Sequence, residues 1–212
     1  MGRAVRACRS GSAAVEFALM VPLFIGLSLT GTEIAYMASV QLQISQIAVS
    51  LSDNASRLGQ SDNSSVTPTV TEADVNSILL GAMKQGSSLN LQANGRIILS
   101  SLEYDDFTGR QWFHWQRCKG NLVRSSAYGP QGAGLDGTTI AGVGMGTTKI
   151  TAISGSAVMV GEIYYQYKGL MGTYVVNQPI IRSEAAFLNR DDRNLGSRDT
   201  NGLSPNATAS SC

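Results

Sequence analysis

The chain carries one carboxylate where an ionisable group has a physical cost. Glu16 lies five residues after Gly11, and the following segment runs to Thr32 without a charge. An ionisable side chain inside a membrane-spanning helix costs a few kcal/mol on insertion, so its presence indicates a function. A carboxylate in such a place can pair with a cation that is also removed from water. We therefore predict a membrane-inserted segment in which Glu16 has a function.

The other residues that could take part in catalysis or metal binding do not combine into an active site. His114 is the chain's single histidine, so a metal site or a His-based triad would need partners that the sequence does not reveal. The glycines of 142–146 follow no clear strand and open no helix, unlike a nucleotide-binding loop. Nothing supports calcium binding at the acidic pairs Asp105–Asp106 and Asp191–Asp192. We expect no enzymatic activity, no cofactor and no metal.

The aromatic cluster Trp112-Phe113-His114-Trp115 allows two interpretations. Its aromatic side chains could belong to a strand and pack on the N-terminal helix, or they could form an exposed patch for adhesion or for a partner. Packing is the interpretation that the strand-like pattern favours.

Length and charge restrict the class of protein. The 212 residues have room for one membrane segment and one domain of ordinary size. A net charge of +1 gives no reason to expect nucleic acid as a partner. Three arginines precede the apolar run without any acid (Arg3, Arg6 and Arg9). By the positive-inside rule, that end stays in the cytoplasm and the rest of the chain is exported.

A long helix is predicted from about Ser12 to Leu58. Its first part, 12–32, has about 21 residues, which is long enough to cross a hydrocarbon core of about 30 Å. Pro22 is expected to kink it. The second part is amphipathic, with apolar residues spaced by three and four: Met37, Val40, Ile44, Ile47, Leu51 and Leu58. The opposite face is predicted to hold Gln41, Gln43, Gln46, Ser50, Ser52 and Asp53. A signal peptide cleaved after the span is the rival interpretation, but 28–31 matches its cleavage pattern poorly.

The rest of the chain predicts an α+β domain. After a polar loop, Thr71 and Asp74 form a capping box for a helix over 72–85, with Val75, Ile78, Leu79 and Met83 buried. Strands are then expected at 97–104, 110–117, 156–167 and 180–188. Residues 129–146 contain seven glycines and predict a long surface loop, and residues 189–212 a polar tail. The fold class is a long N-terminal helix, transmembrane and then amphipathic, packed on a small antiparallel β-sheet domain, as in pilins.

The three cysteines divide between compartments. Cys8 lies on the cytoplasmic side, whereas Cys118 and Cys212 form an even pair in the exported part. Exported domains usually oxidise such pairs, so we predict a disulfide between Cys118 and Cys212. Two free buried thiols are the alternative.

The sequence from Gly11 to Leu23, GSAAVEFALMVPL, resembles the processing and membrane motif of TadE-like proteins. These are the pseudopilins of the tight-adherence (Tad/Flp) pilus, a type IV pilus system. The resemblance is close over residues 9–35 and holds only in layout beyond them. It implies that a prepilin peptidase cuts between Gly11 and Ser12, and that Glu16, Phe17 and Pro22 serve pilus assembly.

Cleavage at this bond would create an ammonium at Ser12, which Glu16 could pair with on the same or a neighbouring subunit. The expected organisation is a leader at 1–11, a stem helix at 12–58 with its transmembrane part at 12–32, a periplasmic or extracellular domain at 59–188, and the tail at 189–212. The resemblance implies partners in the prepilin peptidase, other pilins and pseudopilins, the inner-membrane assembly platform and the membrane. The alternative function is an uncleaved single-pass membrane protein that acts as a fixed periplasmic component of a secretion or pilus machine.

Overall fold

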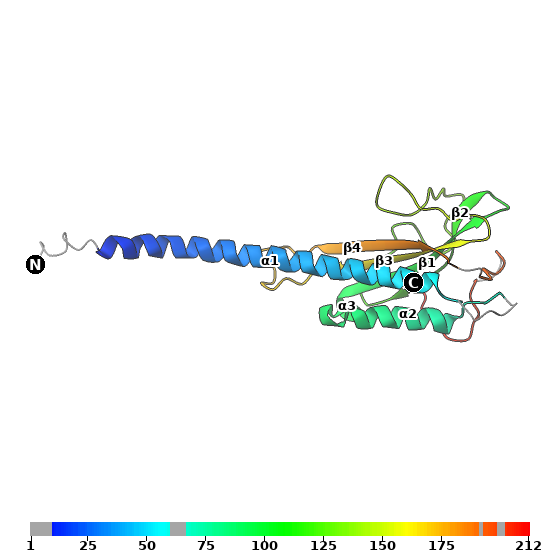
Figure 1. The fold of residues 1–212 in the computed structure, drawn as a ribbon, viewed down its shortest axis with the longest axis horizontal. Coiled ribbons are helices and arrows are strands. Elements are labelled where there is room, and N and C mark those ends of the chain that lie inside the picture. Colours follow the sequence, from blue (N-terminus) through cyan, green and yellow to red (C-terminus); the bar gives the residue numbers. More distant parts are fainter. Residues whose placement is uncertain (1–9, 60–66, 191–192, 199–201) are drawn as a thin grey trace, which may run out of the picture. The chain divides into compact units, whose positions relative to one another are not determined.

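The computed structural model describes residues 10–59, 67–190, 193–198 and 202–212. Its elements are α1 (Ser10–Ser56), α2 (Glu72–Gln85), η2 (Ser87–Leu89), α3 (Leu91–Asn94), β1 (Gly95–Asp105), β2 (Arg110–Lys119), β3 (Ala157–Gln166) and β4 (Ile180–Leu188) (Figure 1). They form two compact units, Met1–Ser39 with Lys168–Gln178, and Val40–Tyr167 with Pro179–Cys212. The leader arginines, Cys8 and the pair Asp191–Asp192 lie outside the described residues.

In the second unit, the amphipathic part of α1 buries one face, as its spacing predicts. The fully buried apolar side chains of this face are Val40, Ile44, Ile47, Ala48, Leu51 and Ala55. Met37 and Leu58 are only half-buried, and the helix ends before Leu58.

The prediction that Ser52 lies on the polar face is wrong. Its side chain is fully buried, and its hydroxyl donates a hydrogen bond to the carbonyl oxygen of Ala185, 2.9 Å away. Gly161 of β3 allows this close approach, because a Cβ at that position would lie 2.4 Å from Ser52 Oγ. A hydroxyl with a backbone acceptor can be buried without losing a hydrogen bond, so a polar residue joins the apolar face.

The second helix begins and ends as predicted. Thr71 is its N-cap, and the capping box is complete: Asp74 N–H donates to Thr71 Oγ1 at 3.2 Å, and Thr71 N–H donates to Asp74 Oδ2 at 3.1 Å. Of its expected core residues, Ile78 is only half-buried. Glu72 in the first turn is buried too, and its Oε2 accepts a hydrogen bond from Arg117 Nε at 2.9 Å.

The four strands form one antiparallel sheet in the order β2-β1-β3-β4. Each lies within three residues of its predicted bounds, and β4 matches them at both ends. The second part of α1 covers one face of the sheet, where a Cβ at Gly161 would lie 3.0 Å from the Leu51 side chain and 3.4 Å from the Ala48 carbonyl oxygen. α2 lies beside this part of α1 (Figure 1), where Gln85 donates a hydrogen bond to Ser50 at 3.1 Å. The predicted α+β class is confirmed.

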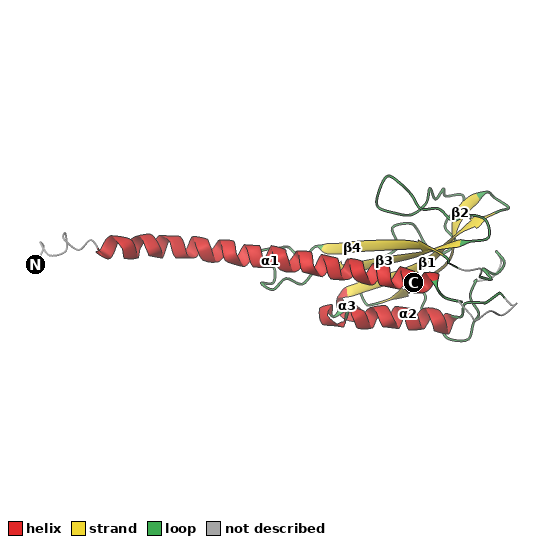
Figure 2. Ribbon diagram, in the orientation of Figure 1, coloured by secondary structure: helices red, strands yellow, loops and turns green. Residues whose placement is uncertain are grey.

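A long connection from β2 to β3 covers the other face of the sheet. It appears as loop in Figure 2, and its glycine-rich part, 129–146, forms neither helix nor strand beyond an isolated bridge between Val143 and Ile150. Two side chains of this glycine-rich part, Ala133 and Val143, are nevertheless buried in the core. The other members of their cluster are Leu102, Phe113, Ala152, Val158 and Val160. The predicted surface loop therefore also serves as one wall of the core.

The polar tail after β4 is attached to the domain. It forms isolated parallel bridges from Asn194 to Thr69 and from Ser204 to Thr71. Arg193 donates to the carbonyl oxygen of Ala55 in the last turn of α1, 3.0 Å away, and burial lowers the pKa of this guanidinium to about 10. A cation at a helix C-terminus interacts favourably with the carbonyl groups of its last turn.

Candidate functional site

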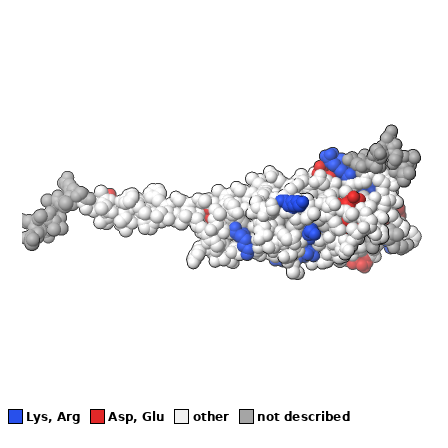
Figure 3. Space-filling view, turned by 90° about the horizontal axis from the view of Figure 1, so that it is seen from below, with Lys and Arg blue, Asp and Glu red and all other residues white. Residues whose placement is uncertain are grey.

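The N-terminal part of α1 in the first unit exposes an extended apolar surface. Its large exposed side chains are Val15, Phe17, Leu19, Met20, Leu23, Phe24, Ile25, Leu27, Leu29 and Ile34. Figure 3 shows almost no charged side chain on this part of the helix. Contiguous apolar surface of this extent marks an interaction site for a membrane or for other proteins.

The predicted processing and assembly residues lie together at the start of this helix. Gly11 and Ser12 are in its first turn and exposed, and Glu16 follows Ser12 by four residues. Residues four apart lie on the same helix face, so the Glu16 carboxylate is placed next to the Ser12 position. Phe17 is 72% exposed. Pro22 lies inside α1, which continues through it.

The same helix meets the physical requirements for a membrane span. Within the described part of the chain, α1 is long and apolar enough to cross a membrane, by length and composition, and its most apolar stretch is not buried in the protein. The helix is consistent with single-pass membrane anchoring.

The comparison with protein families agrees with this geometry. Residues 11–50 match the TadE-like protein family. This TadE-like segment contains the predicted processing and assembly residues, from Gly11 to Pro22, and ends inside the amphipathic part of α1. No curated protein and no solved structure matches the chain.

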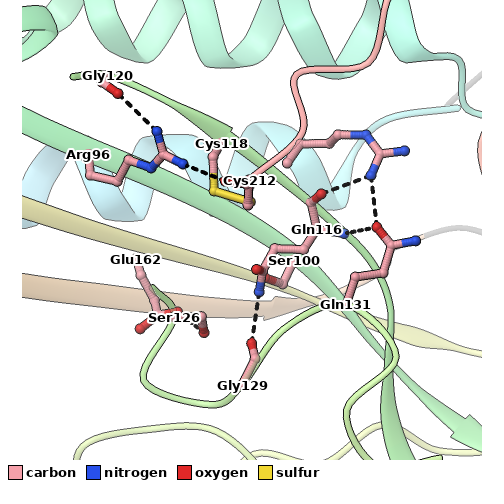
Figure 4. Close-up of a disulfide and its surroundings, with 11 residues drawn as sticks. Arg96, Ser100, Gln116, Cys118, Gly120, Ser126, Gly129, Gln131, Glu162 and Cys212 are labelled. Atoms are coloured by element: carbon pink, nitrogen blue, oxygen red, sulfur yellow. Dashed lines mark hydrogen bonds between the residues drawn. A yellow bond between two sulfur atoms is a disulfide. The ribbon is translucent and has the colours of Figure 1, made fainter. Parts of the chain in front are cut away.

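Beyond the TadE-like segment, the structure confirms the predicted disulfide. Cys118 of β2 is bonded to Cys212, 94 positions later (Figure 4). Cys118 N–H also donates to the carbonyl oxygen of Ser210 at 2.7 Å, and Arg96 donates to the carbonyl oxygen of Cys212 at 3.1 Å. The end of the tail is therefore fixed to the sheet covalently and by hydrogen bonds.

A buried carboxylate organises the loop face of the sheet. Glu162 of β3 is 1% exposed and accepts hydrogen bonds from Ala127 N–H at 3.1 Å, Tyr164 O–H at 3.0 Å and Arg182 at 3.1 Å. Ser126 O–H donates to it as well. The donors come from the β2–β3 connection, β3 and β4, so this carboxylate ties the connection to the sheet. A buried charge with this many partners is stable in place, and its role here is structural.

Tyr164 gives this network a measurable pH dependence. Burial, and then the neighbouring Glu162 charge, raise the pKa of Tyr164 to about 12, from an ordinary value of 10.0. Between these two values the unfolded chain releases this proton while the folded chain keeps it, so the stabilisation is present below pH 10 and is lost as the pH rises to about 12.

We expect the phenolate absorbance of the folded protein to rise in a late step near pH 12. The variant Tyr164→Phe should diminish this step. A late step of unchanged amplitude in Tyr164→Phe would show that Tyr164 is not held in this state.

The structure supplies a partner for the single histidine that the sequence did not reveal. His114 Nδ1 lies 2.8 Å from Glu103 Oε2, and Ser101 O–H donates to Glu103 Oε1 at 2.7 Å. All three side chains are buried, beside a groove of about 370 Å³. A register shift after Ser101 brings His114 to Glu103, and such an irregularity cannot be read from strand alternation. Among the described residues, no group of three or more His, Cys, Asp or Glu could hold a metal ion.

The aromatic cluster is buried, so it forms no exposed adhesive patch. Trp112, Phe113 and Trp115 are at most 6% exposed. Phe113 packs in the core cluster on the loop face, on the side of the sheet away from α1, so the expected packing on the helix is wrong for this residue.

One buried carboxylate in the TadE-like segment was not predicted. Glu33 is completely buried, although its neighbours Thr32 and Ile34 on α1 are exposed. Its Oε2 accepts a hydrogen bond from the Met171 N–H at 3.1 Å. The only sequence signal for it is its position as the first charge after the apolar run.

Proposed function

We propose that this chain is a minor pilin or pseudopilin of a Tad-type (Flp) pilus, required for pilus assembly and surface adhesion. The observation that carries the proposal is the TadE-like match over 11–50. The first part of this segment is an exposed apolar helix, in which Glu16 is the one ionisable residue before Glu33. No catalytic residue is assigned, because the buried charged groups described above serve to hold the fold.

The proposed mechanism begins with hydrolysis of the Gly11–Ser12 peptide bond by a prepilin peptidase. The products are a leader that ends in a carboxylate and a mature chain that begins with an ammonium at Ser12. Glu16, one helical turn later, can pair with this ammonium on the same or a neighbouring subunit, which offsets the desolvation of both charges. The uncleaved chain has no such cation, so cleavage converts a membrane anchor into a subunit that can assemble.

The proposed orientation places the N-terminus in the cytoplasm and the sheet domain in the periplasm, across a bacterial inner membrane. The three leader arginines support it by the positive-inside rule, and the Cys118–Cys212 disulfide supports an oxidising compartment for the domain. The partners would be the peptidase, other pilins and pseudopilins and the inner-membrane assembly platform, with the mature chain incorporated into an extracellular pilus.

The mature N-terminus tests the proposal. Gly11→Leu should leave the full-length chain in the membrane, because the peptidase must approach the backbone closely at the scissile bond. Intact-mass measurement of membrane-extracted protein would show the mass of residues 12–212 for the wild type and of the uncut chain for the variant.

Gly26→Leu is a matched control, since Gly26 lies in the same helix and a Cβ there meets nothing within 4 Å. It should be cut normally. A wild-type chain that keeps its leader would refute the pseudopilin and favour the fixed, uncleaved membrane component.

A further inference from the structure

The loop at 168–178, called here the Glu33 loop, wraps around the buried carboxylate of Glu33 within the first unit. Met171 donates its N–H to Glu33, 138 positions earlier in the chain. Gly169 lies so close that a Cβ there would be 2.4 Å from Glu33 Oε1 and 2.9 Å from the Gly172 carbonyl oxygen. Gly172 N–H donates to Gly169 O at 3.3 Å, which closes a turn over the carboxylate. Glu33 thus fixes the loop to one point on α1.

That point has a defined depth if α1 spans a membrane. The helix rises about 1.5 Å per residue, so the distance from Ser12 to Glu33 is about 31 Å, close to the thickness of a hydrocarbon core. Glu33 is therefore placed at the far boundary of the apolar layer. A buried carboxylate at this level is stabilised by backbone donors, because lipid offers none.

The Glu33 loop exposes the side chains that favour such a boundary. Tyr174 is 95% exposed and Leu170 is 57% exposed, and Ile34 on the adjacent helix is 53% exposed. Lys168, at the start of the loop, is exposed as well. Tyrosine is enriched at membrane–water interfaces, and lysine extends its amine toward the headgroups while its stem lies along apolar surface.

We propose that the Glu33 loop is an interfacial anchor that inserts Tyr174 and Leu170 among the lipid headgroups and upper acyl chains, where the TadE-like helix leaves the bilayer. The proposal rests on the membrane insertion of α1 that the proposed function assumes. The occupant is lipid because the loop is continuous with the apolar surface of the helix that would lie in it. The anchor would fix the depth and rotation of α1 before the subunit is extracted into a filament.

Tryptophan fluorescence in vesicles tests the position of the loop. The full chain carrying Tyr174→Trp is reconstituted in phosphatidylcholine and phosphatidylglycerol vesicles, with bromine near the carbonyl end of the acyl chains. The wild type supplies the background, since Trp112 and Trp115 are 6% and 3% exposed in the sheet domain. We expect the added fluorescence to be blue-shifted and mostly quenched by the brominated lipid. Val123→Trp, at a side chain that is 92% exposed in the other unit, is the reference for an added tryptophan.

Two further readouts separate the possible results. Adding Gly169→Ala to Tyr174→Trp should release the loop and reduce the quenching, while flotation shows that the chain stays in the vesicles. If the Tyr174→Trp chain floats but its added fluorescence is not quenched, the anchor alone is refuted. A blue shift without quenching means that a second copy covers the loop, which also refutes the anchor. A chain that does not float contradicts membrane insertion, and with it both the anchor and the proposed function.

Discussion

Replacing both Cys118 and Cys212 by serine should lower the free energy of unfolding of the sheet domain by about 4–5 kcal/mol. The bond closes a loop of 94 positions, and chain-entropy loss in the unfolded state increases with loop length. Typical domains have a stability of only about 5–15 kcal/mol, so this is a large share. The change is best measured by chemical denaturation of the two proteins, with limited proteolysis to follow the tail.

The expected loss is not confined to the end of the tail. The tail also contacts α2, where Asn76 donates to Thr208 O at 2.8 Å, and Ser204 forms a bridge with Thr71, the N-cap of this helix. These contacts are weaker than the covalent bond, so the tail should become the first site of cleavage in the serine variant.

Cys8→Ser is the control for leader processing, because Cys8 belongs to the proposed leader and not to the sheet domain. Cys8→Ser should leave stability unchanged, and leader processing should be normal in both variants. An unfolding free energy within about 1 kcal/mol of the wild type in the double variant, well short of the chain-entropy value, would show that the hydrogen bonds hold the tail by themselves.

The elements with strong local patterns could be predicted from the sequence. The strands around Ile98 and Val160 belong to segments rich in β-branched and aromatic residues, and the capping box at Thr71 marks the start of α2, so these elements are predicted within a few residues. The TadE-like resemblance over 9–35 likewise lies largely within the segment that matches the family, 11–50. Local chemistry determines each of these features.

The features that depend on a distant partner could not be predicted. Ser52 is predicted on the polar face because serine is polar. The acceptor that allows its burial, the carbonyl oxygen of Ala185, is 133 positions away in the chain. Glu33 resembled an ordinary charge at the end of a span, because nothing near it indicates the loop at Met171. The sequence indicates no partner for His114, because its contact with Glu103 depends on a register shift in the sheet. In all three cases a polar side chain is buried together with a hydrogen-bond partner that only the tertiary structure brings near it.

The variant Glu16→Gln should block assembly while leaving insertion and cleavage intact. Glutamine matches the shape of glutamate but carries no charge, so membrane insertion becomes easier. The ammonium at Ser12 then lies in a low-dielectric environment without its counter-charge. Removal of one partner from a buried ion pair costs about 3–5 kcal/mol, which is a factor of about 150 to 4,000 in subunit association.

The measurement is the amount of assembled pilus and of surface adhesion in cells that express the variant, together with the mass of the membrane-retained protein. Val15→Ala is the matched control, since it shortens the neighbouring side chain, which is 60% exposed, without changing a charge. It should assemble normally. Glu16→Asp keeps the charge but moves it closer to the backbone, so we expect intermediate assembly. Because Gln keeps the size and shape of Glu but lacks its charge, normal piliation in Glu16→Gln would contradict the pairing of Glu16 with the new N-terminus.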